Sequence, residues 1–262
     1  MFIDKLKLFS FATINNNANQ DLINDQINKY LKDSIQKVDI RVKKQRIWIN
    51  YNPEKFLNLT EDNLKGLTFE ELLETTKEIQ KLLDDISSIC NITIEKSVED
   101  FQISRIDLTQ NIFTDYTFSE YIRMFENIKP NRKLSFIRVK AHEGHMEVKD
   151  YSTIYFRSKE RTGRQNSFTI TIYDKKEHFR AMKIPLDKEY ENKNIMRFEL
   201  SFNNSTTVNR KLNIKTLRDL TDDLNFTKLN ERREEILNYY LFYEDESVSD
   251  LLNNLETERR YV

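Results

Sequence analysis

An arginine followed two residues later by an acid occurs in two stretches of the sequence, at Arg105 and Asp107 and again at Arg197 and Glu199. Side chains on a β-strand alternate between its two faces, so the arginine and the acid of each stretch project from the same side. Tyr173 falls on the polar side of a third alternating run. Together, the three stretches predict a polar sheet face that carries two acids and a tyrosine.

These residue types suit attack by a tyrosine on a phosphodiester. Mg²⁺ and Mn²⁺ prefer carboxylate oxygens, so Asp107 and Glu199 are the candidate ligands of an ion that polarises the scissile phosphate. A phenol with an ordinary pKa of about 10 needs a nearby cation to become the attacking phenolate. Lys175 would supply positive charge if the strand of Tyr173 continues to it. The product would be a phosphotyrosine link to a DNA end.

A structural interpretation of the same residues stays open. In that interpretation the two arginine and acid sets form cross-strand ion pairs on a solvated sheet face. Charged alternation is common in half-exposed antiparallel sheets, so the strand pattern alone favours the ion pairs.

The elements that must position this face are predicted from periodicity. Alternating runs separated by helical patterns predict an α+β fold, in which a central, mainly antiparallel sheet is covered by helices on one face and followed by a helical C-terminal segment. Thr68 and Glu71 form a capping box that starts one helix, and Trp48 lies in a hairpin strand as a packing residue or a base-stacking platform. Strands are predicted over 2–11, 38–42, 47–51, 101–112, 134–139, 146–148, 152–157, 167–173 and 195–202, and helices over 20–32, 68–89, from 117 or 119 to 130, 176–183 and beyond 214.

Composition limits the class of protein. The 262 residues with 38% hydrophobic content can bury a core, and we expect three segments, 1–95, 96–213 and 214–262. The single cysteine excludes an internal disulfide, and three glycines exclude a glycine-rich phosphate cradle. No apolar run reaches the roughly 18 residues of a membrane span, and the first residues lack the pattern of a signal peptide. We therefore expect a cytoplasmic protein without a membrane partner.

Charge is unevenly distributed along the chain. Residues 131–184 hold 13 Lys and Arg against 6 Asp and Glu, whereas the whole chain has a formal net charge of −1. A local basic surface is the electrostatic footprint of a phosphate-backbone binder, although solvated lysines and arginines on strand edges would give the same count.

The ordered motifs resemble the gene II replication initiators of filamentous phages. Ile103-Ser-Arg-Ile-Asp107 resembles the Ile-Ser-Arg-Ile-Asp segment of that family, and Met196-Arg-Phe-Glu199 resembles its Arg-Phe-Glu strand. Ser152-Thr-Ile-Tyr-Phe leads into Tyr173-Asp-Lys175 as the family's Ser-Thr-Val segment leads into Tyr-Leu-Lys. More loosely, Thr153-Ile-Tyr-Phe, Ile172-Tyr173-Asp-Lys175 and Arg197-Phe-Glu199 also resemble the Rep proteins of staphylococcal rolling-circle plasmids. The similarity spans roughly residues 1 to 220 and rests on the order and spacing of short motifs.

The resemblance implies that Tyr173 is the nicking nucleophile and that Asp107 and Glu199 occupy the family's acidic positions. Tyr155 is a rival nucleophile because it can share the polar face, although the phage motif places no tyrosine there. Cations on or beside the face are candidate DNA-binding residues, and three more side chains are weaker candidates for the metal shell. The DNA-binding set is Arg105, Arg157, Arg197 and Lys176, and the weaker metal candidates are His142, His145 and Glu147.

His142 and His145 do not match the two-histidine metal motif of related rolling-circle nucleases. That motif separates its histidines by one apolar residue on a strand, whereas two residues including a glycine intervene here. The pair would project to opposite faces of a strand, so a loop or turn is predicted for this stretch.

The sequence therefore predicts a metal-dependent endonuclease and strand transferase that initiates rolling-circle DNA replication of a phage or plasmid. Its partners would be single-stranded or extruded origin DNA and a host helicase. The alternatives are a non-catalytic origin- or operator-binding protein and a relaxase of a mobile element.

Overall fold

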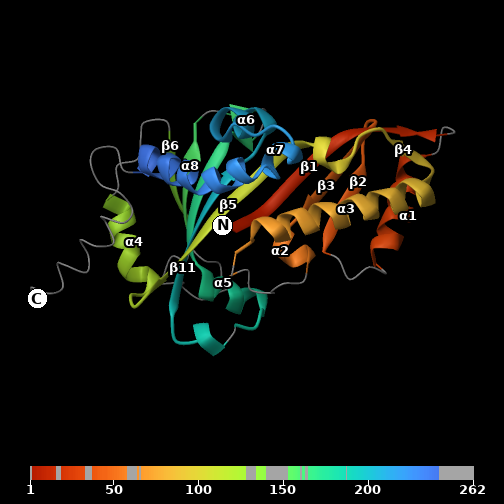
Figure 1. Ribbon diagram of the computed structural model, residues 1–262. Helices are drawn as coiled ribbons and strands as arrows, with labels where there is room; N and C mark the ends of the chain where they lie inside the picture. The colour runs from red at the N-terminus through yellow and green to blue at the C-terminus, as the bar shows by residue number, and fades with distance from the viewer. Residues whose placement is uncertain are drawn as a thin grey trace, which may run out of the picture. The chain divides into compact units, whose positions relative to one another are not determined.

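The computed structural model describes residues 2–15, 19–32, 37–57, 64, 66–127, 134–139, 153–159, 161–162, 165–186 and 188–241 (Figure 1). Within these ranges the fold is α+β with antiparallel strand pairing, as the sequence predicts. The strands are β1 (Phe2–Ile14), β2 (Val38–Val42), β3 (Arg46–Tyr51), β4 (Ile92–Ile94), β5 (Gln102–Thr114), β6 (Leu134–Val139), β7 (Thr153–Ser158), β8 (Arg161–Thr162), β9 (Gln165–Asn166), β10 (Phe168–Asp174) and β11 (Asn194–Phe202). The helices are α1 (Gln20–Lys32), α2 (Pro53–Phe56), α3 (Phe69–Cys90), α4 (Phe118–Asn127), α5 (Lys175–Met182), α6 (Ser205–Leu212), α7 (Leu217–Leu220) and α8 (Asp223–Leu241), with 3₁₀ turns η2 (Val98–Asp100) and η3 (Lys188–Tyr190).

The chain forms two compact units. The first contains Met1–Gln110 and Ser201–Lys228, and the second contains Asn111–Leu200 and Leu229–Val262. Strands β5 and β11 and helix α8 each contribute residues to both units. The three predicted segments, 1–95, 96–213 and 214–262, stay a prediction.

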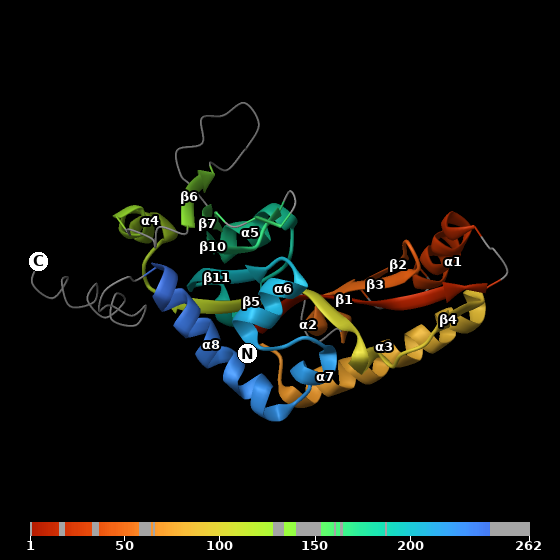
Figure 2. The same cartoon turned by 90° about the horizontal axis from the view of Figure 1, so that it is seen from above.

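The first unit is built on strands in the order β2-β3-β1-β5, with β4 paired to the end of β1. Leu6 and Leu8 of β1 and Ile47 and Ile49 of β3 are buried because alternation turns them to one face. Figures 1 and 2 show α3 running along this part of the sheet. Its apolar stripe supplies the other side of the core, with Leu72, Ile79, Leu83 and Ile86 at most 1% exposed.

The predicted capping box at the start of α3 is confirmed. Thr68 Oγ1 accepts a hydrogen bond from the backbone N–H of Glu71 at 3.2 Å, and the Thr68 N–H donates to Glu71 Oε2 at 2.7 Å. These two bonds satisfy backbone donors that a helix start otherwise leaves without a partner. The helix ends at Asn91, whose φ of 49° is the left-handed conformation of a helix C-cap.

The predicted hairpin of residues 38–51 is also confirmed, with β2 and β3 in register from Val38–Tyr51 to Val42–Ile47. Lys43 and Arg46 exchange backbone hydrogen bonds across its tip, at 2.8 and 3.1 Å. Lys44 and Gln45 both have positive φ, at 51° and 55°. This left-handed pair gives the tip a backbone twist that matches the twist of the two strands.

The second unit contains strands in the order β11-β10-β7-β6. β7 pairs antiparallel with both β10 and β6. Helix α5 follows β10 directly and matches the helix predicted over 176–183. The strand predicted over 146–148 lies outside the described residues. No helix in the described ranges is long and apolar enough to cross a membrane.

Candidate functional site

Asp107 in the first unit is held by the arginine of its own strand. Arg105 Nε donates to Asp107 Oδ1 at 2.9 Å, and Arg105 Nη2 donates to Asp107 Oδ2 at 2.8 Å. Arg105 Nη2 also lies 3.4 Å from Ser201 Oγ. The predicted shared face of Arg105 and Asp107 is therefore confirmed, but the ion pair runs along one strand and does not cross between strands.

The part of this face around Asp107 is buried, whereas a solvated face was one of the two interpretations. Asp107 is 2% exposed and Thr109 is fully buried. Burial raises the pKa of the Asp107 carboxyl above its ordinary value, while the hydrogen bonds from Arg105 act in the opposite direction. The nearby charge of Asp4 adds a smaller upward effect on the pKa. Arg105 therefore compensates a carboxylate that water can scarcely reach.

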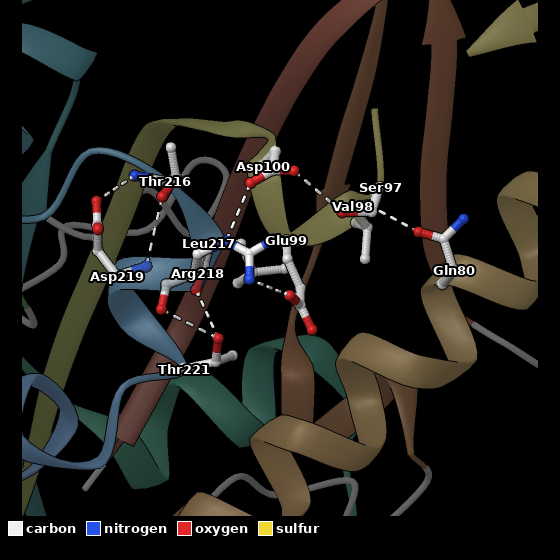
Figure 3. Close-up of polar contacts among 10 residues, drawn as sticks. All are labelled: Gln80, Ser97, Val98, Glu99, Asp100, Thr216, Leu217, Arg218, Asp219 and Thr221. Carbon is white, nitrogen blue, oxygen red and sulfur yellow. Dashed lines mark hydrogen bonds and ion pairs between the residues drawn. The ribbon is translucent and has the colours of Figure 1, made fainter. Parts of the chain in front are cut away.

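The start of β5 is fixed by the segment that leads into α7. The Ile103 N–H donates to the Lys215 carbonyl and the Leu217 N–H donates to the Phe101 carbonyl, each at 3.0 Å. Figure 3 shows Arg218 reaching from α7 to the turn before β5. Its guanidinium contacts Glu99 at 2.9 Å and Asp100 at 3.0 Å.

Other polar contacts fix the two elements that this guanidinium joins (Figure 3). Thr216 and Asp219 form a capping box at the start of α7. Gln80 of α3 accepts a hydrogen bond from the Val98 N–H at 2.7 Å. The start of the strand that carries Arg105 and Asp107 is thus tied to both α3 and α7.

In the second unit, β11 carries Arg197 and Glu199 with contrasting exposure. The predicted core residues of this strand, Met196, Phe198 and Leu200, are buried. Arg197 is also fully buried, whereas Glu199 is half-buried. Arg197 was predicted to contact DNA, but in the structure its side chain lies in the interior.

Tyr173 lies near the end of β10 and is half-buried. It is paired with Thr153 of β7, while Tyr155 is paired with Thr171. Directly paired residues of antiparallel strands project from the same face, so Tyr173 and Tyr155 share one face of β7 and β10. The Arg157 guanidinium lies 5.1 Å from the centre of the Tyr155 ring. Both tyrosines therefore fit the predicted polar face.

The predicted placement of Lys175 beside Tyr173 required the strand to continue to Lys175. In the structure it does not. Asp174 ends β10 and caps α5, since its Oδ1 accepts from the backbone N–H of Lys176 at 2.9 Å and of Glu177 at 3.0 Å. Burial raises the pKa of the Asp174 carboxyl. Lys175 is thus the first residue of a helix, 5% exposed, with its ammonium 4.5 Å from the centre of the Phe179 ring.

Lys176, one residue further along α5, also has backbone partners. Its ammonium donates to the carbonyl of Glu191 and, at 3.3 Å, to that of Lys193. These bonds tie the start of α5 to the turn that precedes β11. The predicted role of Lys176 in DNA binding stays a prediction.

His178 was not singled out from the sequence, yet it contacts Tyr173. The two rings lie edge to face with their centres 5.5 Å apart. The signal that could have found it is the aspartate between Tyr173 and Lys175, since Asp174 is a residue type that starts helices. Because α5 begins directly after Asp174, His178 lies in its first turn, close to Tyr173 at the end of β10.

Within the described ranges, no group of three or more His, Cys, Asp or Glu side chains is placed to hold a metal ion. His142, His145 and Glu147 lie outside the described residues.

No protein-family model matches the sequence, and no curated protein matches it. Among solved structures, the chain is similar to a rolling circle replication initiator protein from Geobacillus stearothermophilus, with a TM-score of 0.44 and 10% sequence identity. The alignment covers 95% of this chain and 88% of that chain.

Proposed function

We propose that this protein initiates rolling-circle replication by nicking one strand of origin DNA and remaining linked to it through Tyr173. The observation that carries this proposal is the placement of Tyr173 at the end of β10, half-buried beside the His178 ring. The order and spacing of the motifs that resemble phage initiators support the same assignment. Single-stranded or extruded origin DNA is the proposed substrate, and a host helicase is the proposed partner.

The reaction is a transesterification at phosphorus. The phenolic oxygen of Tyr173 forms a bond to the phosphorus, and the bond from phosphorus to one DNA sugar oxygen breaks. We assign His178 to receive the phenol proton, directly or through one water, because its imidazole packs against the Tyr173 ring. The departing sugar oxygen takes up a proton, and no oxidant or other co-reactant is consumed.

We further propose that Asp107 and Glu199 are each ligands of Mg²⁺ or Mn²⁺. Carboxylate oxygens are the ligands that these ions prefer, and a bound ion would supply charge stabilisation to the phosphate. The two oxygens of Asp107 already accept hydrogen bonds from Arg105. An ion at Asp107 would therefore have to share the carboxylate with Arg105 or displace it.

A nicking assay on labelled single-stranded origin DNA tests the proposal. The protein is incubated with Mg²⁺ or Mn²⁺ and analysed on a denaturing gel for a protein-linked DNA band. We expect Tyr173→Phe to abolish this band and Tyr155→Phe to retain it, since both variants keep a ring on the same face. A Tyr173→Phe protein that still forms the link would overturn the assignment.

The assay also separates the two alternative functions. Specific binding of origin DNA with no covalent product under any metal condition would identify a non-catalytic origin- or operator-binding protein. Nicking of the transfer origin of a mobile element, with no nicking of a replication origin, would identify a relaxase.

A further inference from the structure

The outward faces of β1, β2 and β3 place aromatic and basic side chains in adjacent rows. Strand register pairs Phe9 with Trp48 and Phe11 with Arg46 between β1 and β3. It also pairs Trp48 with Arg41 between β3 and β2. We call this set the basic-aromatic face, and define it as Lys7, Phe9, Phe11, Arg41, Arg46 and Trp48. All of it belongs to the first unit.

The rings of this face lie in contact with one another and with cations. Phe9 and Trp48 stack with their centres 4.8 Å apart and their planes 25° apart. The Arg46 guanidinium lies 5.3 Å from the Phe9 ring and 5.4 Å from the Phe11 ring. The Lys7 ammonium lies 5.2 Å from the Trp48 ring. Phe11 is nevertheless 58% exposed, so part of the aromatic surface is open to a ligand.

Positive charge dominates the hollow that this face borders. The hollow has a volume of about 920 Å³, and the one acid among the described residues that line it, Asp39, forms an ion pair with Arg41 at 2.8 Å. Lys43 and Lys44 at the hairpin tip are exposed and add two cations. The cations among its lining residues are Lys7, Arg41, Lys43, Lys44 and Arg46. A polyanion is the ligand that this charge favours.

From this combination we infer that the basic-aromatic face binds single-stranded nucleic acid. Proteins that bind single strands without reading their sequence combine a cationic groove for phosphates with aromatic rings on which bases stack. Phe11 offers an open ring, and the cations at the tip and on the strands lie beside it. A duplex keeps its bases stacked inside and cannot use exposed rings in this way, so the observations favour a single strand.

The inference extends beyond the proposed nicking site, because no residue of this face takes part in the chemistry assigned to Tyr173. Trp48 is the only tryptophan in the chain, so its fluorescence reports on this face alone. The probe is an oligonucleotide of thymidines that lacks any origin sequence. We expect it to quench Trp48 emission in the wild type and in Tyr173→Phe alike, with an affinity that falls as salt rises.

Two variants test the two parts of the face. Phe11→Ala removes an exposed ring, and we expect Kd to rise roughly 5- to 140-fold, the range for loss of one base–aromatic stack. A double variant, Lys43→Gln with Lys44→Asn, removes charge and retains a residue that tolerates positive φ at position 44. We expect it to lower the slope of log Kd against log salt by about 1 to 2.

The matched control is Tyr239→Ala, which removes another exposed aromatic side chain, 50% exposed, from α8. We expect it to bind like the wild type. Unchanged Trp48 emission, or wild-type affinity in both test variants, would overturn the inference. A duplex of the thymidine oligonucleotide with its complementary adenine strand is tested in parallel. Equally tight binding of this duplex would exclude single-strand recognition. Circular dichroism of each variant checks that it is folded, and the double variant at the exposed tip leaves the core untouched.

Discussion

Replacement of Asp107 by alanine would break an ion pair whose carboxylate is almost wholly buried. The Asp107 side chain is 3% exposed and that of Arg105 is 33% exposed. In the variant, the guanidinium loses both hydrogen bonds to the carboxylate, which measure 2.9 and 2.8 Å in the wild type. Water can reach part of Arg105 and can replace some of the hydrogen bonding that the guanidinium loses.

The expected loss of stability follows from the different exposure of the two partners, Asp107 and Arg105. Removing one partner of a fully buried pair costs about 3 to 5 kcal/mol in the free energy of unfolding, and an exposed pair contributes at most about 1 kcal/mol. Because Arg105 is one-third exposed, we expect Asp107→Ala to lower the free energy of unfolding by about 2 to 3 kcal/mol. The assay is urea unfolding followed by circular dichroism, with midpoint and slope compared at pH 7.

The chain offers a matched control in the pair of Arg41 and Asp39 on β2. These residues are also two apart on a strand and 2.8 Å from one another, but their side chains are 70% and 43% exposed. We expect Asp39→Ala to change the free energy of unfolding by less than about 0.5 kcal/mol. Equal effects of Asp39→Ala and Asp107→Ala would refute the burial argument. A coupling energy near zero in a double-mutant cycle of Asp107→Ala with Arg105→Ala would show that the ion pair itself contributes nothing to the free energy of unfolding.

The pH dependence gives a second signature. Because the pKa of Asp107 is raised, the folded chain holds this proton more strongly than the unfolded chain. The resulting stability is fully present below the ordinary pKa of 3.8 and is lost as the pH rises through the raised value. The cost of Asp107→Ala should therefore grow as the pH falls from 7 toward 4. A cost that shrinks would show that Arg105 outweighs burial.

Three further predictions concern the metal, the α3 cap and Arg218. Mg²⁺ should raise the thermal midpoint of the wild type and not that of Glu199→Gln, and equal shifts would remove that acid from the metal proposal. Thr68→Ala should cost about 0.5 to 2 kcal/mol by thermal unfolding, with Thr68→Ser as the control. Arg218 lowers the pKa of Asp100 by a hydrogen bond, so wild-type stability should fall as the pH drops below 3.8. The Arg218→Ala variant should not lose stability in this way. The same decrease in stability with falling pH in both proteins would contradict the assignment.

Local patterns in the sequence predicted the elements and their faces. Alternation placed Tyr173 and Tyr155 on one face of β7 and β10, and the register confirms it. The spacing of Thr68 and Glu71 predicted the start of α3, and the hairpin around Trp48 was also predicted. These predictions succeed because side-chain alternation and helix capping depend on neighbours in the sequence alone.

Burial was not predictable in the same way, because it depends on segments distant in the sequence. Alternation showed that Asp107 shares a side with Arg105, but the packing of the folded chain decided that Asp107 on this side is buried. The same holds for Arg197, whose charge suggested an exposed position, whereas the structure buries its side chain. The end of β10 at Asp174 likewise moved Lys175 from a strand into a helix.

The sequence by itself therefore determined which residue types share a face, including the acid and arginine of β5 and the tyrosines of β7 and β10. Only the tertiary structure decided which faces water can reach and which distant residues meet there. Phe9 and Trp48 are 39 positions apart in the chain, and only the pairing of β1 with β3 brings their rings together. The reason is physical, since the period of a strand is a local property, whereas desolvation and ring stacking require another segment to pack against it.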